Sequence, residues 1–126
     1  MEVKIMPHRK LQILAENEVE RSLERLPKDV RAAADECTVH FEEMAALDEL
    51  ELDDETLGIF EGNNRLDPPP QLPGEMPRIR LFMDNLWDFA EGDERLFREE
   101  VRVTYLHELG HYLGWDEAQV KAYGLA

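Results

Sequence analysis

The sequence contains little cysteine, little positive charge and no long apolar run. Cys37 is the single cysteine among 126 residues, so no disulfide forms within the chain and a metal site built from several thiolates is excluded. Lysine and arginine number 14 against 29 aspartate and glutamate residues, which gives a formal net charge of −15. Because nucleic-acid backbones are also negative, we expect no nucleic-acid partner. No apolar segment approaches the ~18 residues of a membrane span, so we expect no membrane partner either.

The rest of the composition is typical of one globular domain. Hydrophobic residues make up 43% and charged residues 34% of the chain, the balance of a folded protein with a modest core. We therefore expect a single domain over residues 1–126. The first residues contain no apolar leader segment, so we expect a cytoplasmic protein. Cys37 precedes a segment of alternating polarity, where we expect it to be buried as a small apolar side chain.

Apolar periodicity predicts two long helices. In residues 8–26, apolar side chains recur every three or four positions, and Pro27 ends the segment. A second helix is expected over residues 94–113, with Asp93 as its N-cap. The second half of this helix is apolar on nearly all sides, so we expect that half to be the buried one.

Three short segments have the alternation and composition of strands, at residues 37–42, 57–61 and 78–83. Gly58 in the second is expected to mark a bulge or a close backbone approach. The order of these elements predicts an α+β fold. We expect a minimal zincin-like arrangement, in which a small mixed sheet carries the N-terminal helix and the C-terminal helix on one face.

The segments between these elements are expected to be irregular or only briefly helical. Residues 28–36 form a short connector, and the acidic stretch that follows the first strand contains a short helix over residues 44–50. Residues 62–77 hold five of the 7 prolines and are predicted to form a long loop. A turn is expected over residues 84–93 and a last helical turn over residues 118–123.

One stretch of the second long helix has the HExxH pattern of zinc hydrolases, namely His107-Glu108-Leu109-Gly110-His111. Residues four apart on a helix project from the same face, so the two imidazoles can reach one metal ion. Glu108 lies ~100° around the helix, beside the metal, where a general base belongs. Residues 103–115 carry no other charged side chain. Three ionisable groups in an apolar segment are costly to bury unless they are paired or bind a metal.

An acidic third ligand is available shortly after this motif. Gly114 is suited to end the helix, because glycine accepts the left-handed conformation at this point. The chain can then turn back and bring the carboxylate of Glu117 to the metal.

These residues resemble the small bacterial zincin-like metallopeptidases, single-domain proteins known as minimal zincins. The likeness rests on the helix ending Leu26-Pro27, the segment Arg78-Ile79-Arg80-Leu81-Phe82 and the motif Val101-Arg-x-Thr104-x-Leu106-His-Glu-x-Gly110-His-x-x-Gly114-x-x-Glu117. The resemblance implies one zinc ion held by His107, His111 and Glu117, with Glu108 as the catalytic base. The family usually has aspartate as third ligand, so Asp116 competes with Glu117, which occupies the position that related zincins use.

The resemblance also implies a chemistry, zinc-dependent hydrolysis of a peptide or protein substrate. Three protein ligands leave the fourth position of zinc for a water, whose pKa zinc lowers towards ~7. Glu108 accepts a proton from that water and passes it to the leaving amine. Tyr112 and Tyr123 are candidates for stabilising the oxyanion. Related zincins bind the peptide as an extra strand on a sheet edge, which the resemblance places at residues 57–61.

Two alternative functions remain open from the sequence. Only nine residues follow Glu117, so we expect a shallow site whose missing wall a protein partner or a second copy supplies. The first alternative is a catalytically weak or inactive zinc-binding domain that binds a protein partner. If both Asp116 and Glu117 bound the zinc, no position would remain open for water and the site would be structural. A zinc hydrolase acting on RNA is disfavoured by the net charge, although several arginines are candidates for a basic patch: Arg78, Arg80, Arg95, Arg98 and Arg102.

Overall fold

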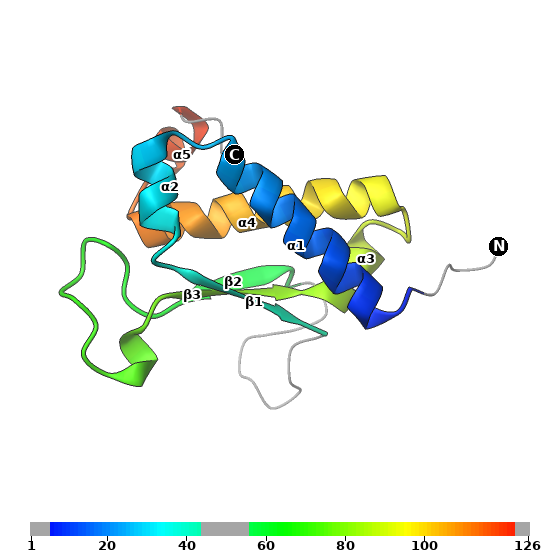
Figure 1. Cartoon of the computed structure of the whole chain (residues 1–126), viewed down its shortest axis with the longest axis horizontal. Helices are drawn as coiled ribbons and strands as arrows, with labels where there is room; N and C mark the ends of the chain where they lie inside the picture. The colour runs from blue at the N-terminus through cyan, green and yellow to red at the C-terminus, as the bar shows by residue number, and fades with distance from the viewer. Residues whose placement is uncertain (1–5, 44–55, 123–126) are drawn as a thin grey trace.

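The computed structural model describes residues 6–43 and 56–122, apart from the side chain of Glu117. The short helix expected over residues 44–50 and the candidate Tyr123 lie outside the described residues. In the described part of the chain, helices and strands form the small mixed α+β fold that the sequence predicts (Figure 1).

Two long helices, α1 and α4, pack across each other above the sheet (Figure 1). α4 spans Glu94–Leu113, which is the predicted range. α1 spans His8–Glu24, two residues shorter than the predicted 8–26. The carboxylate of Asp93 caps α4 by accepting a hydrogen bond from the backbone N–H of Leu96 at 3.0 Å, as predicted. α1 buries Leu11, Ala15 and Val19, which recur at a spacing of four, so one apolar stripe fixes how it lies on α4.

The shorter helices are α2 at Lys28–Ala34, α3 at Met83–Phe89 and α5 at Glu117–Ala122. The turn predicted over residues 84–93 is wrong in its first half, which belongs to α3. Met83, Leu86 and Trp87 are all buried there, at the i, i+3, i+4 spacing of an amphipathic helix. Seven residues give too short a window for that spacing to stand out. The helix is instead fixed by tertiary contacts, among them the bond from the Asn85 side chain to the carbonyl of Thr56 at 2.7 Å.

The sheet has three strands, β1 at Thr38–Glu42, β2 at Gly58–Glu61 and β3 at Arg78–Phe82. β3 lies in the centre, parallel to β1 and antiparallel to β2. β2 is therefore an edge strand of the described sheet, and it runs along α4. Gly58 marks a close approach, one of the two predicted possibilities, because a Cβ there would lie 2.8 Å from Thr104 of α4.

The core lies between the sheet and the helices. Ile79 and Leu81 of β3 are fully buried on the helix side, and Phe97, Val101 and Leu109 of α4 are buried with them. Cys37 is buried as predicted, and burial raises the pKa of its thiol to about 12. The free thiol therefore stays protonated and packs as a small apolar group.

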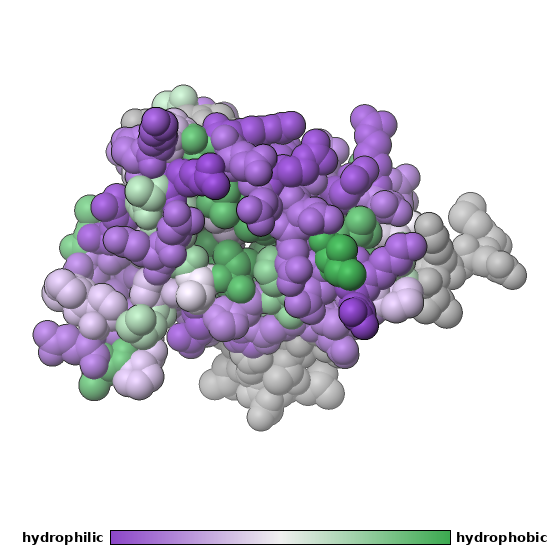
Figure 2. Space-filling view, in the orientation of Figure 1, coloured by the Kyte–Doolittle hydropathy of each residue, from purple (hydrophilic) through white to green (hydrophobic). Residues whose placement is uncertain are grey.

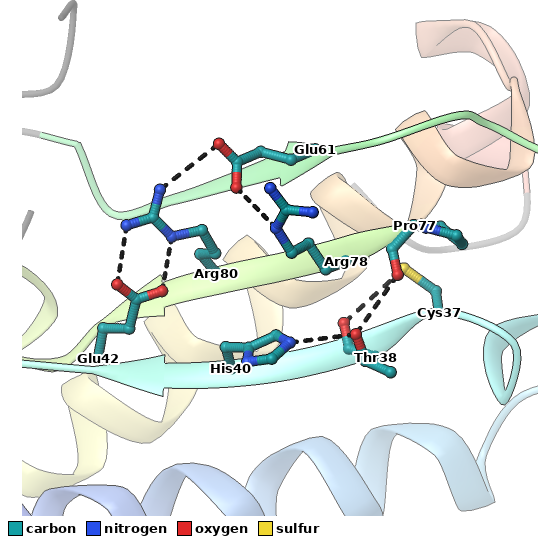
Figure 3. Close-up of polar contacts among 8 residues, drawn as sticks. All are labelled: Cys37, Thr38, His40, Glu42, Glu61, Pro77, Arg78 and Arg80. Atoms are coloured by element: carbon teal, nitrogen blue, oxygen red, sulfur yellow. Dashed lines mark hydrogen bonds and ion pairs between the residues drawn. The ribbon is translucent and has the colours of Figure 1, made fainter. Parts of the chain in front are cut away.

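The other face of the sheet carries a ladder of opposite charges across all three strands (Figure 3). Arg80 of β3 forms a two-point contact with Glu42 of β1, with distances of 2.6 and 2.8 Å. Its third nitrogen lies 3.5 Å from Glu61 of β2, and Glu61 also accepts a 3.0 Å bond from Arg78. Arg78 and Arg80 are thus neutralised by carboxylates, and this face is not the basic patch that RNA binding requires.

The surface seen in Figure 2 is mostly hydrophilic, as a chain with a net charge of −15 requires. None of the helices described here combines the length and the apolar character needed to cross a membrane.

The loop between β2 and β3 is tied to the end of α4. It contains a short 3-10 helix, η1, at Pro73–Glu75. The backbone N–H of Arg65 donates to the carbonyl of Tyr112 at 2.8 Å, which satisfies one of the last carbonyls of α4. The predicted loop is therefore ordered against the helix that carries the histidine motif.

Candidate metal centre

The second half of α4 is the buried half, as predicted, but the two histidines of the motif lie on its open side. Tyr105, Leu106, Leu109 and Leu113 are buried around them, whereas the His111 side chain is 54% exposed. A metal bound here would meet protein on one side and solvent on the other. This arrangement agrees with the shallow, open site expected from the sequence.

The two imidazoles face each other one turn apart. Their Nε2 atoms lie 3.3 Å apart, and the ring planes are inclined by 83°. Two nitrogens at ~2.0–2.1 Å from a tetrahedral zinc ion are ~3.3–3.4 Å apart. The side chains of His107 and His111 therefore already stand at the separation that a shared metal requires, and the three ionisable groups of the motif form a cluster able to hold an ion.

Glu108 lies beside the histidine pair in a more enclosed position. Its side chain is 11% exposed, and its Oε1 lies 4.0 Å from the Nε2 of His111. Burial raises the pKa of this carboxyl group, while the two histidines and a hydrogen bond from the backbone N–H of Phe60 act in the opposite direction. The Phe60 bond connects the carboxylate to strand β2. Sequence reasoning missed this contact, because no residue pattern signals which backbone amide will face a helix.

The end of α4 is shaped by Gly114. This residue has φ 73° and ψ 23°, the left-handed conformation predicted for it, and the backbone N–H of Trp115 donates to the carbonyl of Gly110 across the turn. A Cβ at Gly114 would lie 2.5 Å from the side chain of Leu66. The loop after β2 therefore closes over the turn, a contact that the sequence did not indicate.

Asp116 caps α5 instead of joining the histidine cluster. Its carboxylate accepts a bond from the backbone N–H of Gln119 at 2.8 Å, and the Gln119 side chain accepts one from the backbone N–H of Asp116 at 3.0 Å. This reciprocal pair is a capping box, and the spacing Asp-x-x-Gln was its signal in the sequence. Glu117 is the next residue and begins α5. Its side chain lies outside the described part of the structure, so its role as third ligand stays a prediction.

The Tyr112 side chain contacts Glu36 and Phe60 in this structure. Its hydroxyl donates to the carboxylate of Glu36 at 3.2 Å, and its ring packs on Phe60 with centroids 5.9 Å apart. Burial and Glu36 together raise the pKa of Tyr112 to about 12. The oxyanion role suggested for Tyr112 stays a prediction, and the same role for Tyr123 falls outside the described residues.

A model of the zincin-like metallopeptidase family matches residues 34–125. The chain belongs to this family. The match begins at the last residue of α2 and includes the whole sheet, α3, α4 and α5. The N-terminal helix, which also contributed to the resemblance, lies outside it. A comparison with curated proteins finds no match.

The packing of α5 gives a reason for Gly110, the fourth residue of the motif. A Cβ at Gly110 would lie 2.8 Å from Cγ2 of Val120, which is buried on α5. Glycine at this position therefore lets α5 pack directly against α4, and α5 begins at the candidate ligand Glu117.

Gly110→Ala should lower the free energy of unfolding by roughly 1 kcal/mol. Overpacking costs roughly 1–3 kcal/mol, and the better helix propensity of alanine offsets roughly 0.5–1 kcal/mol of that. In a Val120→Ala background the clash is absent, so Gly110→Ala should there raise stability by roughly 0.5–1 kcal/mol. Urea denaturation of the four proteins measures both effects. An equal effect of Gly110→Ala in both backgrounds would rule out the close contact as its cause.

Proposed function

We propose that the protein is a zinc-dependent metallopeptidase. The single observation that carries the proposal is the pair of imidazole Nε2 atoms 3.3 Å apart, with the enclosed carboxylate of Glu108 beside them. The family match supports the reaction class, and the separation of the two nitrogens supports a tetrahedral metal ion such as zinc.

His107 and His111 would hold the ion together with the carboxylate of Glu117. Asp116 is occupied in the cap of α5, which supports Glu117 as the third ligand and a site that keeps one position open. When bound, zinc supplies a Lewis acid and makes a water acidic enough to lose its proton near neutral pH. The open position separates this proposal from a purely structural zinc site.

Glu108 acts as the proton carrier in this proposal. Its carboxylate lies 4.0 Å from the Nε2 atom of His111, close to the ion's site. The hydrogen bond from Phe60 holds the carboxylate in place. Burial favours the neutral acid, which helps the group to take a proton from the attacking water; the protonated acid then returns the proton to the leaving amine.

The peptide binds along the free edge of β2. The carbonyl of Leu57 accepts a bond from the backbone N–H of Phe82 in β3. Successive residues of a strand direct their N–H and C=O groups to opposite sides. Leu57 directs its carbonyl towards β3, so the main-chain N–H and C=O groups of Gly58 and Phe60 point to the outer edge of β2. The amide of Phe60 is used by Glu108, and the main-chain groups of Gly58 are placed to pair with a peptide backbone. Main-chain pairing does not depend on side chains, so the edge should accept peptides of many different sequences.

Metal removal tests the proposal directly. The purified protein should contain one zinc ion per chain by elemental mass spectrometry and should hydrolyse a mixture of unstructured peptides. Dialysis against a chelator should abolish both the bound zinc and the hydrolysis, and stoichiometric zinc should restore them, because the ion has only protein ligands and water to hold it. Hydrolysis that survives complete removal of metal would refute the proposal, as would failure to bind zinc after reconstitution.

A further inference from the structure

A groove of about 450 Å³ extends from the histidine motif along α4 and the edge strand β2. Its walls come from two segments of the chain, the start of β2 and the middle of α4. The residues that matter for its chemistry are Leu57, Gly58, Glu100, Val103, His107 and Glu108. The groove therefore begins at the candidate metal site and continues beside the strand edge where we place the peptide.

Glu100 stands at the end of this groove away from the histidines. It precedes His107 by two turns of α4, so it shares the helix face of Thr104 and His107. The residue is partly exposed. In the part of the chain that the structure describes, no lysine or arginine forms an ion pair with Glu100; the carboxylates in such pairs are those of Glu18, Glu42 and Glu61. Glu100 thus offers an unneutralised carboxylate to whatever occupies the groove.

The lining combines apolar walls with negative charge. Leu57, Gly58 and Val103 provide apolar surface, whereas Glu100 and Glu108 provide carboxylates, and the lining includes no lysine or arginine. Lysine and arginine side chains have a long apolar stem and a charged end, and both parts match this lining. An acidic side chain would meet the like charge of Glu100 at the end of the groove away from the histidines, and the net charge of −15 adds to that repulsion.

We propose that Glu100 makes the groove selective for a peptide with lysine or arginine near the cleaved bond. The seven residues from Glu100 to His107 span ~10.5 Å of helix, which equals about three residues of an extended peptide. The basic residue therefore lies within three positions of the bond, on the side of the peptide that follows α4 towards its N-terminus. This inference deepens the proposed peptidase function and rests on it.

The test compares arginine with citrulline, which has the same shape and no charge. Each fluorescently labelled peptide carries one arginine or one citrulline. The substituted position is varied over the three residues on either side of a fixed central bond. Binding is measured by fluorescence anisotropy on zinc-loaded full-length Glu108→Gln protein, and hydrolysis on the wild type. At one position arginine should bind about fivefold more tightly than citrulline, the upper range for a partly exposed ion pair. Glu100→Gln should remove this preference, and Glu100→Lys should reverse it, so that citrulline binds more tightly than arginine at that position.

Glu99→Gln is the matched control, because it removes the same charge from the neighbouring exposed residue, which does not line the groove. This variant should keep the preference for arginine. Equal binding of arginine and citrulline peptides at all positions would overturn the inference, and so would a preference that survives Glu100→Gln or no peptide binding at all. A preference lost in Glu100→Gln, without hydrolysis by the wild type, would support the charge selection and refute the peptidase.

Discussion

Replacing Glu108 with glutamine should lower peptide hydrolysis by a factor of roughly 10²–10⁴, the range that a positioned general base contributes. Glutamine has nearly the same shape and can still accept the hydrogen bond from the Phe60 amide, but it cannot take a proton. Zinc content should remain at the wild-type level, because the two imidazoles of the site are unchanged. Steady-state kinetics beside elemental analysis of the same samples measures both quantities.

The same substitution has a second expected result that separates catalysis from folding. The Glu108 side chain is 11% exposed, and a buried charge is costly when it lacks a full set of partners. The neutral amide should therefore leave the melting temperature of the metal-free protein unchanged or raise it. Undiminished hydrolysis in Glu108→Gln would remove this residue as the base. A wild type that binds zinc but cleaves no peptide would instead favour the non-catalytic, partner-binding domain.

Replacing His111 with alanine should weaken zinc binding more than 100-fold. Loss of a group that only orients a metal ligand costs 10–100-fold, and the loss of a ligand itself should exceed that. Because the His111 side chain is 54% exposed, its removal should change the stability of the metal-free protein by no more than ~0.5 kcal/mol. Competition with a zinc-sensitive dye measures the affinity, and thermal unfolding with and without zinc shows whether binding still stabilises the fold.

His40→Ala is the control for this experiment. His40 is exposed on β1, where its ring lies 3.2 Å from the hydroxyl of Thr38 on the sheet face that carries the charge ladder (Figure 3). This substitution also removes an exposed imidazole, and zinc affinity should stay at the wild-type value. Zinc binding that falls equally in both variants would indicate adventitious surface histidines, and binding that persists in His111→Ala would contradict the assigned site.

Periodicity and spacing predicted much of the fold. The range of α4, its Asp93 cap, the left-handed Gly114 and the three strands depend on local residue preferences, which are visible in a single sequence. The HExxH spacing likewise brought two imidazoles together, because helix geometry alone fixes that relation. These features need no knowledge of the rest of the chain.

The remaining features depend on contacts between distant segments. No residue pattern indicated that Phe60 holds Glu108, that Leu66 covers Gly114, or that Gly110 contacts Val120. α3 was missed because its stability comes from burial rather than from propensity. From the sequence, Asp116 and Glu117 were both candidates for the third ligand because both side chains are carboxylates. In the structure the Asp116 carboxylate instead caps the start of α5.

The placement of β3 between β1 and β2 has a consequence for the order of folding. Glu42 and Arg80, which join β1 to the centre of the sheet, are 38 positions apart, so the parallel pair forms only after a long segment has closed into a loop. Closing such a loop costs chain entropy before any contact offsets it. We therefore expect the β2–β3 hairpin and the helices to assemble early and β1 to join late. Lengthening the acidic stretch between β1 and β2 should then slow folding more than it lowers the stability of the folded state.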